Sequence, residues 1–178
     1  MINFEYLENN LDKLRLEYLA AQPFPHLIID GFCDEQKLTK AYESIPELDN
    51  KSRDYAFANN KFEKSNYKEL GTELAELHSE LLSERFNKIL SYITAKSIFV
   101  DPKNHGGGLH QGKKNSFLDM HLDFNYHPIN KNWYRELNLL LYLNKGWKPE
   151  YKGGLRIKDL RTNHESEIDV PFNRLIVQ

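Results

Sequence analysis

The sequence predicts an α+β fold in which N-terminal helices pack on a C-terminal β-region of the sandwich or jelly-roll kind. Apolar residues recur at helical spacing up to about residue 93, whereas short β-type runs separated by Gly, Pro and Asn follow residue 97. A chain of 178 residues is most simply one domain. We expect residues 1–96 to form a mainly helical support and 97–178 the β-core.

The helical part is predicted to contain three helices, each with a buried apolar stripe. Leu7, Leu11 and Leu14 place the first over about 4–21, and the "QPFPH" segment ends it. Asp34 is the expected N-cap of the second, which Pro46 ends. The third covers about 67–93, and 47–66 is expected to be a loop.

Six short segments are candidate strands, and their close spacing favours antiparallel pairing. The first, "HLIID", lies between the first two helices. The others are "SIFVD", "SFLDMHLDF", "ELNLLLYLN", "GGLRIKDL" and "SEIDVPFNRLIVQ".

Charge and composition exclude several classes of protein. The 24 basic and 26 acidic side chains give a net charge of −2, which offers no electrostatic reason to expect nucleic acid or an anionic membrane as partner. No apolar run approaches the roughly 20 residues that cross a bilayer, and the polar N-terminus is unlike a secretory signal. The lone Cys33 excludes an internal disulfide. These features predict a cytoplasmic protein.

The segment "FLDMHLDF" places a histidine and an aspartate two positions apart. In a strand, His121 and Asp123 would share one face with Cα atoms about 7 Å apart, a separation that lets both side chains reach one cation. Two histidines and one carboxylate on one side of an iron leave positions open for exogenous ligands. The simpler alternative is the polar face of an ordinary surface strand.

The next predicted strand, "ELNLLLYLN", alternates between two different faces. Four leucines share one face, whereas Asn138, Leu140 and Tyr142 share the other. Tyr142 can therefore point into the cavity that the His121 face lines. An amphipathic tyrosine at the edge of the barrel is the alternative explanation.

These motifs together resemble a known family. "GGGLHQ…FLDMHLDFNYHP…RELNLLLYLNKGW…YKGGLRI…PFNRLIV" is similar to the prolyl-4-hydroxylase-like branch of the Fe(II)/2-oxoglutarate-dependent dioxygenases. The resemblance extends over nearly the whole chain and is strongest from Gly106 to Val177. It implies a double-stranded β-helix (jelly-roll or cupin-like) core behind the N-terminal helices.

The resemblance also implies roles for individual residues. His121 and Asp123 correspond to two of the three iron ligands, and Tyr142 to a tyrosine that contacts the 2-oxoglutarate carboxylate. His110, Asn125 and Tyr126 lie where the family contacts its substrate, although a solvated loop and turn chemistry before Pro128 explain them equally well. The implied cofactors are Fe(II), 2-oxoglutarate as co-substrate and O₂, with ascorbate as a further candidate.

The implied reaction is hydroxylation of a C–H bond, coupled to oxidative decarboxylation of 2-oxoglutarate. The substrate would be a small molecule or a protein side chain.

The chain departs from the family pattern at its C-terminal end. The pattern requires a distal histidine and a basic residue that binds 2-oxoglutarate, and the sequence stops at Gln178 before either. We therefore expect a core that is incomplete at its C-terminus, with an open β-edge available for association. The only later histidine, His164, falls on an expected hairpin and is not a ligand candidate. A catalytically inactive jelly-roll module that binds a ligand or a partner is the alternative function.

Two further motifs are rejected as functional sites. Gly107, Gly112 and Lys113 have the spacing of a phosphate-binding loop, but Lys114 stands where Ser or Thr is needed and a strand follows instead of a helix. The histidines near this segment lack the paired spacing of a zinc site. The glycines are expected to form tight turns.

Overall fold

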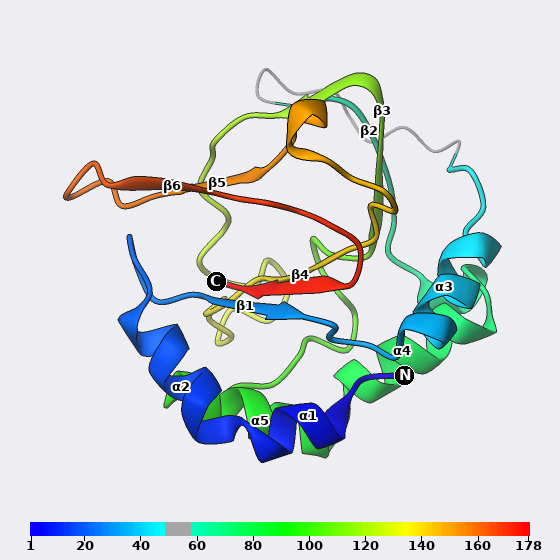
Figure 1. Ribbon diagram of the computed structural model, residues 1–178. Helices are drawn as coiled ribbons and strands as arrows, with labels where there is room; N and C mark the ends of the chain where they lie inside the picture. The colour runs from blue at the N-terminus through cyan, green and yellow to red at the C-terminus, as the bar shows by residue number, and fades with distance from the viewer. Residues whose placement is uncertain (49–57) are drawn as a thin grey trace.

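A three-stranded antiparallel sheet lies at the centre of the molecule, between a layer of helices and a two-stranded hairpin (Figure 1). The computed structural model describes residues 1–48 and 58–178. The sheet has the order β1 (Leu27–Asp30), β7 (Arg174–Val177) and β4 (Leu139–Tyr142). The hairpin consists of β5 (Leu155–Lys158) and β6 (Glu165–Ile168).

The helices are shorter than the sequence predicted. The bounds are α1 Phe4–Asn9, α2 Leu11–Ala20, α3 Glu35–Ser44, α4 Thr72–Leu81 and α5 Glu84–Thr94, with 3₁₀ turns at Tyr67–Glu69 and Pro149–Tyr151. The expected first helix divides at Asn10. The expected third helix divides at Gly71 and again at Ser83, whose hydroxyl accepts the Phe86 N–H as an N-cap. Asp34 caps α3 as predicted, because its carboxylate accepts the Lys37 N–H.

The two faces of the central sheet pack into two different cores. Leu27 of β1, Leu175 of β7 and Leu139 of β4 belong to the large core that the helices cover. Ile176 of β7 faces the opposite way, into a smaller core with Ile157 and Ile168 of the hairpin. The β4 alternation predicted from the sequence is confirmed, since Leu140 and Tyr142 pack on this second core.

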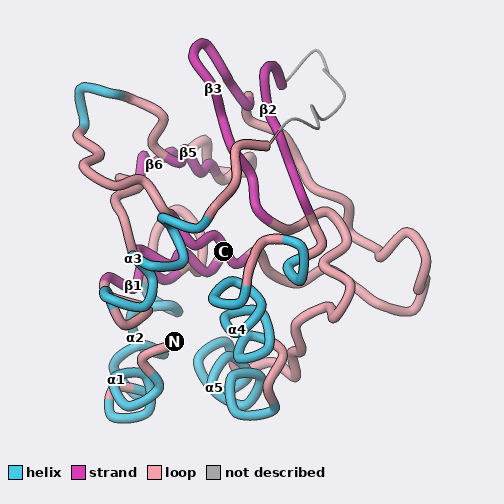
Figure 2. The backbone as a smooth tube through the Cα atoms, turned by 90° about the vertical axis from the view of Figure 1, so that its right-hand side faces the viewer, coloured by secondary structure: helices cyan, strands magenta, loops and turns pink. Residues whose placement is uncertain are grey.

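A strand that the sequence did not predict stands beside these layers. β2 (Ala58–Lys64) pairs with the long strand β3 (Leu109–Leu118), and Figure 2 shows the two extending away from the helices. The loop expected over 47–66 is therefore wrong for β2, while 49–57 lie outside the described residues. The turns expected of the glycines are found at Gly106 but not at Gly112, which lies within β3.

Two of the remaining strand predictions differ from the structure. The segment "SIFVD" is not a strand, and "SEIDVPFNRLIVQ" forms two strands, β6 and β7, joined by a turn. Antiparallel pairing is confirmed for all the strand pairs of the described residues. These pairs form three separate small sheets, so a mixed α/β fold with antiparallel sheets is established and a double-stranded β-helix is not.

No helix in the described part of the chain is long and apolar enough to cross a membrane. Cys33 is buried, and burial raises the pKa of its thiol to about 12.

Candidate metal centre

His121 and Asp123 lie close together on the segment that follows β3. The sequence placed them within a strand, but β3 ends at Leu118, so the face alternation that we used to pair them does not apply. Their side chains nevertheless converge, with His121 Nε2 lying 3.8 Å from Asp123 Oδ1. About a third of each side chain is exposed, which leaves the pair accessible from solvent.

The His121 ring is held in one orientation by its own backbone. Nδ1 lies 2.7 Å from the carbonyl oxygen of Asp119, a contact in which Nδ1–H donates. The neutral ring therefore carries its lone pair on Nε2, on the side that faces Asp123. A histidine whose second nitrogen donates to a carbonyl is the usual arrangement of a metal ligand.

The Asp123 carboxylate is bound through one of its two oxygens. Asn138 donates its Nδ2–H to Oδ2 over 2.8 Å, and Arg135 Nη2 lies 3.2 Å from the same oxygen. Oδ1 is the oxygen that faces His121. Oδ2 is thus engaged by Asn138 and Arg135, whereas Oδ1 is directed toward His121.

A hairpin connects Asp123 to the residues that contact it. Its neck is closed by the Arg135 N–H, which donates to the Asn125 carbonyl over 2.7 Å, and by an antiparallel bridge between Tyr126 and Tyr134. Because the chain reverses in this hairpin, Arg135 lies beside Asp123.

His127 is buried at the base of this hairpin and fixes its turn. Nδ1 accepts the N–H groups of Ile129 and Asn130 over 3.1 and 2.8 Å, which places the ring proton on Nε2. Nε2 then lies 3.4 Å from Asp101 Oδ2, on the segment before the glycines.

The paired donors fit two neighbouring positions around a divalent cation. With metal–ligand bonds of about 2.1 Å, two ligands at a right angle lie about 3 Å apart, and a small side-chain rotation closes the present 3.8 Å. An imidazole and a carboxylate suit Fe(II). Within 1–48 and 58–178, no group of three or more His, Cys, Asp or Glu side chains is arranged to hold a metal ion. His121 and Asp123 would thus supply two of the ligands.

Tyr142 lies on the same side of β4 as the residue that contacts Asp123. Asn138 precedes Tyr142 by four positions, so their Cα atoms are about 13 Å apart along the extended chain. Burial raises the pKa of the Tyr142 phenol to about 12. The phenol therefore stays protonated at neutral pH and can donate a hydrogen bond to an anion.

The three candidate substrate contacts are placed differently. Tyr126 is 61% exposed and packs edge-on against Tyr134, and Asn125 adjoins it at the neck of the hairpin. Both follow Asp123 within three positions of the chain. His110 lies on β3, where its Nε2 is 3.9 Å from Glu63 Oε2, and no described contact links it to the His121–Asp123 pair. Burial lowers the pKa of His110.

The Lys113 side chain, on β3, contacts Glu47 and Phe62. Its ammonium lies 2.6 Å from Glu47 Oε1 and over the ring of Phe62. This ion pair lowers the pKa of the Glu47 carboxyl through a hydrogen bond.

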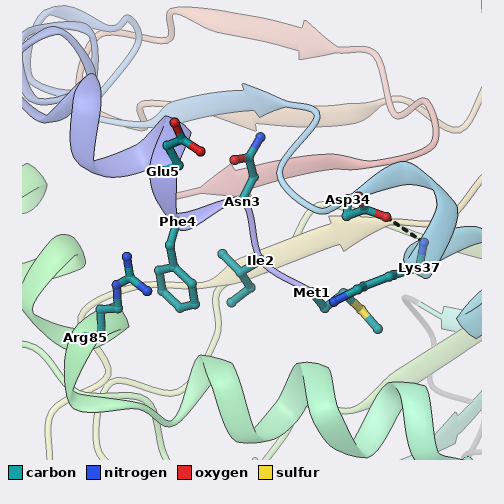
Figure 3. A pocket seen from close by; sticks show the side chains of 8 residues that line it. All are labelled: Met1, Ile2, Asn3, Phe4, Glu5, Asp34, Lys37 and Arg85. Carbon is teal, nitrogen blue, oxygen red and sulfur yellow. Dashed lines mark hydrogen bonds between the residues drawn. The ribbon is translucent and has the colours of Figure 1, made fainter.

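Two hollows of the molecular surface have walls that do not include His121 or Asp123. Figure 3 shows one of about 430 Å³ at the start of the chain. It is lined by Met1, Ile2, Asn3, Phe4, Glu5, Asp34, Lys37 and Arg85. A second, of about 280 Å³, includes Trp147 and Phe172. Neither has a candidate site residue in its wall.

Arg135 and Asn138 were not predicted as site residues. The period-2 pattern of "ELNLLLYLN" did place Asn138 on the face of Tyr142, which is the signal that could have identified it. Arg135 carries no such signal, because its position depends on how the hairpin closes.

Comparison with known proteins supports the same chemistry. Residues 100–178 match the family described as the 2OG-Fe(II) oxygenase superfamily. A search of curated proteins finds no match to the chain. The matched region contains the His121–Asp123 pair and every strand after β2. The match supports an oxygenase class of enzyme, with Fe(II), 2-oxoglutarate and O₂ as the cofactors that the superfamily implies.

Proposed function

We propose that this protein is an Fe(II)- and 2-oxoglutarate-dependent dioxygenase that hydroxylates a C–H bond, in the manner of the prolyl-4-hydroxylase-like branch. The observation that carries the proposal is the convergence of His121 Nε2 and Asp123 Oδ1 to 3.8 Å inside the region that matches the superfamily. The iron, when bound, supplies the activation of O₂ and the oxidising chemistry.

The residues of the chain bind and orient the reactants. His121 and Asp123 hold the metal from one side, which leaves the remaining positions for the co-substrate and O₂. Tyr142 donates its hydroxyl proton in a hydrogen bond to a carboxylate of 2-oxoglutarate. Asn125 and Tyr126, next to the ligand pair, contact the substrate. We propose substrate contact for His110 as well, which lies on β3 beside Glu63.

The substrate that we propose is a small molecule or a protein side chain. The exposed ring of Tyr126 offers an apolar surface next to the pair. This location suits a substrate that approaches from solvent and places one C–H bond near the metal.

Substitution of the two ligands tests the proposal. We expect the wild-type chain to bind about one Co(II) per chain weakly, and His121→Ala and Asp123→Ala to lose measurable binding in isothermal titration calorimetry. Both side chains are about a third exposed, so their removal leaves the fold intact by circular dichroism. His164→Ala removes a histidine from the turn between β5 and β6 and serves as the matched control. Full metal affinity in either ligand variant would contradict the assignment.

The second candidate function is a catalytically inactive module that binds a ligand or partner through the same fold. It is favoured by the absence of a third metal-binding side chain beside the pair among the described residues. Binding of 2-oxoglutarate that does not depend on metal would support it over the enzyme.

A further inference from the structure

Two side chains from the segment just before β4 converge on a single oxygen of Asp123. Asn138 Nδ2 donates to Oδ2 over 2.8 Å, and Arg135 Nη2 lies 3.2 Å from it. Oδ1 faces His121 Nε2 instead. The carboxylate thus has one oxygen engaged by the protein and one directed to the candidate metal position.

The two donors also fix each other. Arg135 Nε donates to Asn138 Oδ1 over 3.0 Å, and Nη2 of the same guanidinium contacts that oxygen as well. The Asn138 amide therefore accepts from the cation and donates to the anion. A flipped amide would face its NH₂ group to the guanidinium and its oxygen to the carboxylate, so only one orientation is favourable.

The backbone holds both donors in place. The Arg135 N–H donates to the Asn125 carbonyl over 2.7 Å, and the guanidinium lies over the ring of Phe124 at 4.5 Å from its centre. Asn138 exchanges two backbone hydrogen bonds with Gln178, over 2.6 and 3.1 Å, which extend the ladder between β4 and β7. The orientation of Asp123 is therefore set by the central sheet and by the hairpin neck.

We propose that Asn138 and Arg135 are positioning residues that hold Asp123 as a one-oxygen ligand, which rests on the function proposed above. A carboxylate whose second oxygen accepts a hydrogen bond and faces a guanidinium binds a cation through its remaining oxygen. This keeps a coordination position open that a two-oxygen carboxylate would occupy. The open position is then available to a co-substrate that chelates the metal.

Asn138→Ala removes the hydrogen bond to Asp123 Oδ2, and its matched control is Asn144→Ala. Asn144 lies just beyond β4 and donates its Nδ2–H to the Val170 carbonyl over 2.8 Å, away from the metal pair. The two variants thus remove the same group and a hydrogen bond of the same length. We expect Asn138→Ala to weaken Co(II) binding by about 10- to 100-fold, the usual effect of losing a partner that orients a ligand. Asn144→Ala should bind as the wild type does.

The visible spectrum of bound Co(II) supplies a readout that a loss of stability would not change. The intensity of this spectrum depends on the number of ligands around the metal. In Asn138→Ala the carboxylate of Asp123 can bind through both oxygens, so we expect the spectrum at saturating metal to change in this variant and not in Asn144→Ala. Arg135→Ala combined with Asn138→Ala should cost no more affinity than Asn138→Ala, because the residues act as one unit.

Equal affinities and spectra for Asn138→Ala and the wild type would overturn the positioning role and leave the proposed function standing. The same loss in Asn144→Ala would also overturn it. A folded wild-type chain that binds no Co(II) would overturn the proposed function and, with it, this inference.

Discussion

The chemistry of the site depends on where single protons and lone pairs lie. The Asp119 carbonyl keeps the proton of His121 on Nδ1, and Asn138 together with Arg135 engages one oxygen of Asp123. Each candidate ligand thus directs one donor atom to the other. At Tyr142, burial raises the pKa to about 12 and keeps the phenol a hydrogen-bond donor.

Tyr142→Phe tests the role of that donor. We expect metal affinity to be unchanged and 2-oxoglutarate to bind the metal-loaded chain roughly 10- to 100-fold more weakly, since a hydrogen bond to a charged group is worth about 1.5–3 kcal/mol. The wild-type phenol stays protonated well below its pKa of about 12, so this ratio should be constant between about pH 6 and 9. Equal affinities measured by calorimetry would remove Tyr142 from the site.

At the scale of elements, the sequence predicted features that depend on neighbouring residues, and it missed a strand pairing between residues far apart in the chain. Asp34 was predicted as a helix cap and the β4 faces were assigned correctly, because both depend on a few neighbouring residues. β2 was missed because its "ANNKFEK" sequence is mostly polar, and its pairing with β3 joins residues about fifty positions apart.

The sequence predicted that His121 and Asp123 lie close together, but it did so from a strand that ends before them. The proximity of His121 and Asp123 was expected from strand alternation, whereas both lie beyond the end of β3. Arg135 reaches Asp123 only after the hairpin neck closes at Asn125, and no local pattern encodes that closure.

The junction of β2 and β3 depends on one glycine of the "GGG" segment. Gly108 has φ +126°, and a Cβ there would lie 2.5 Å from the Lys64 carbonyl oxygen. We expect Gly108→Ala to lower the free energy of unfolding in urea by more than about 1 kcal/mol. Gly107→Ala is the control, since its Cβ would meet only ordinary contacts at 3.6 Å or more. Equal stability of the two variants would show that the close approach is unimportant.

At the scale of the whole molecule, the N-terminal and C-terminal parts are joined through the central sheet. β1 pairs with β7 along its whole length, and the Arg174 guanidinium donates to both carboxylate oxygens of Asp30 across this pair, over 2.7 and 2.8 Å. The Arg174 hydrogen bonds lower the pKa of the Asp30 carboxyl. The sheet that carries the ladder to Asn138 is thus joined to the N-terminal part of the chain through β1.

Asp30→Asn should reveal this ion pair as a pH-dependent loss of stability. Because the folded pKa of Asp30 is lowered, its stabilisation is complete above the unfolded value of about 3.9 and disappears as the pH falls through the folded pKa. The Asp30 side chain is 65% exposed, so the loss at neutral pH should be at most about 1 kcal/mol. Thermal unfolding as a function of pH measures it. A difference from the wild type that persisted in strong acid would contradict the ion-pair explanation.

The most direct test of the proposed function is an anaerobic titration of the 178-residue chain with Fe(II), with and without 2-oxoglutarate. The readout is the weak metal-to-ligand charge-transfer band of the chelated co-substrate in the visible. We predict that the band appears only with both components and saturates near one iron per chain. A chain that remains folded and shows no band at saturating iron and 2-oxoglutarate would contradict the dioxygenase assignment and favour the inactive module.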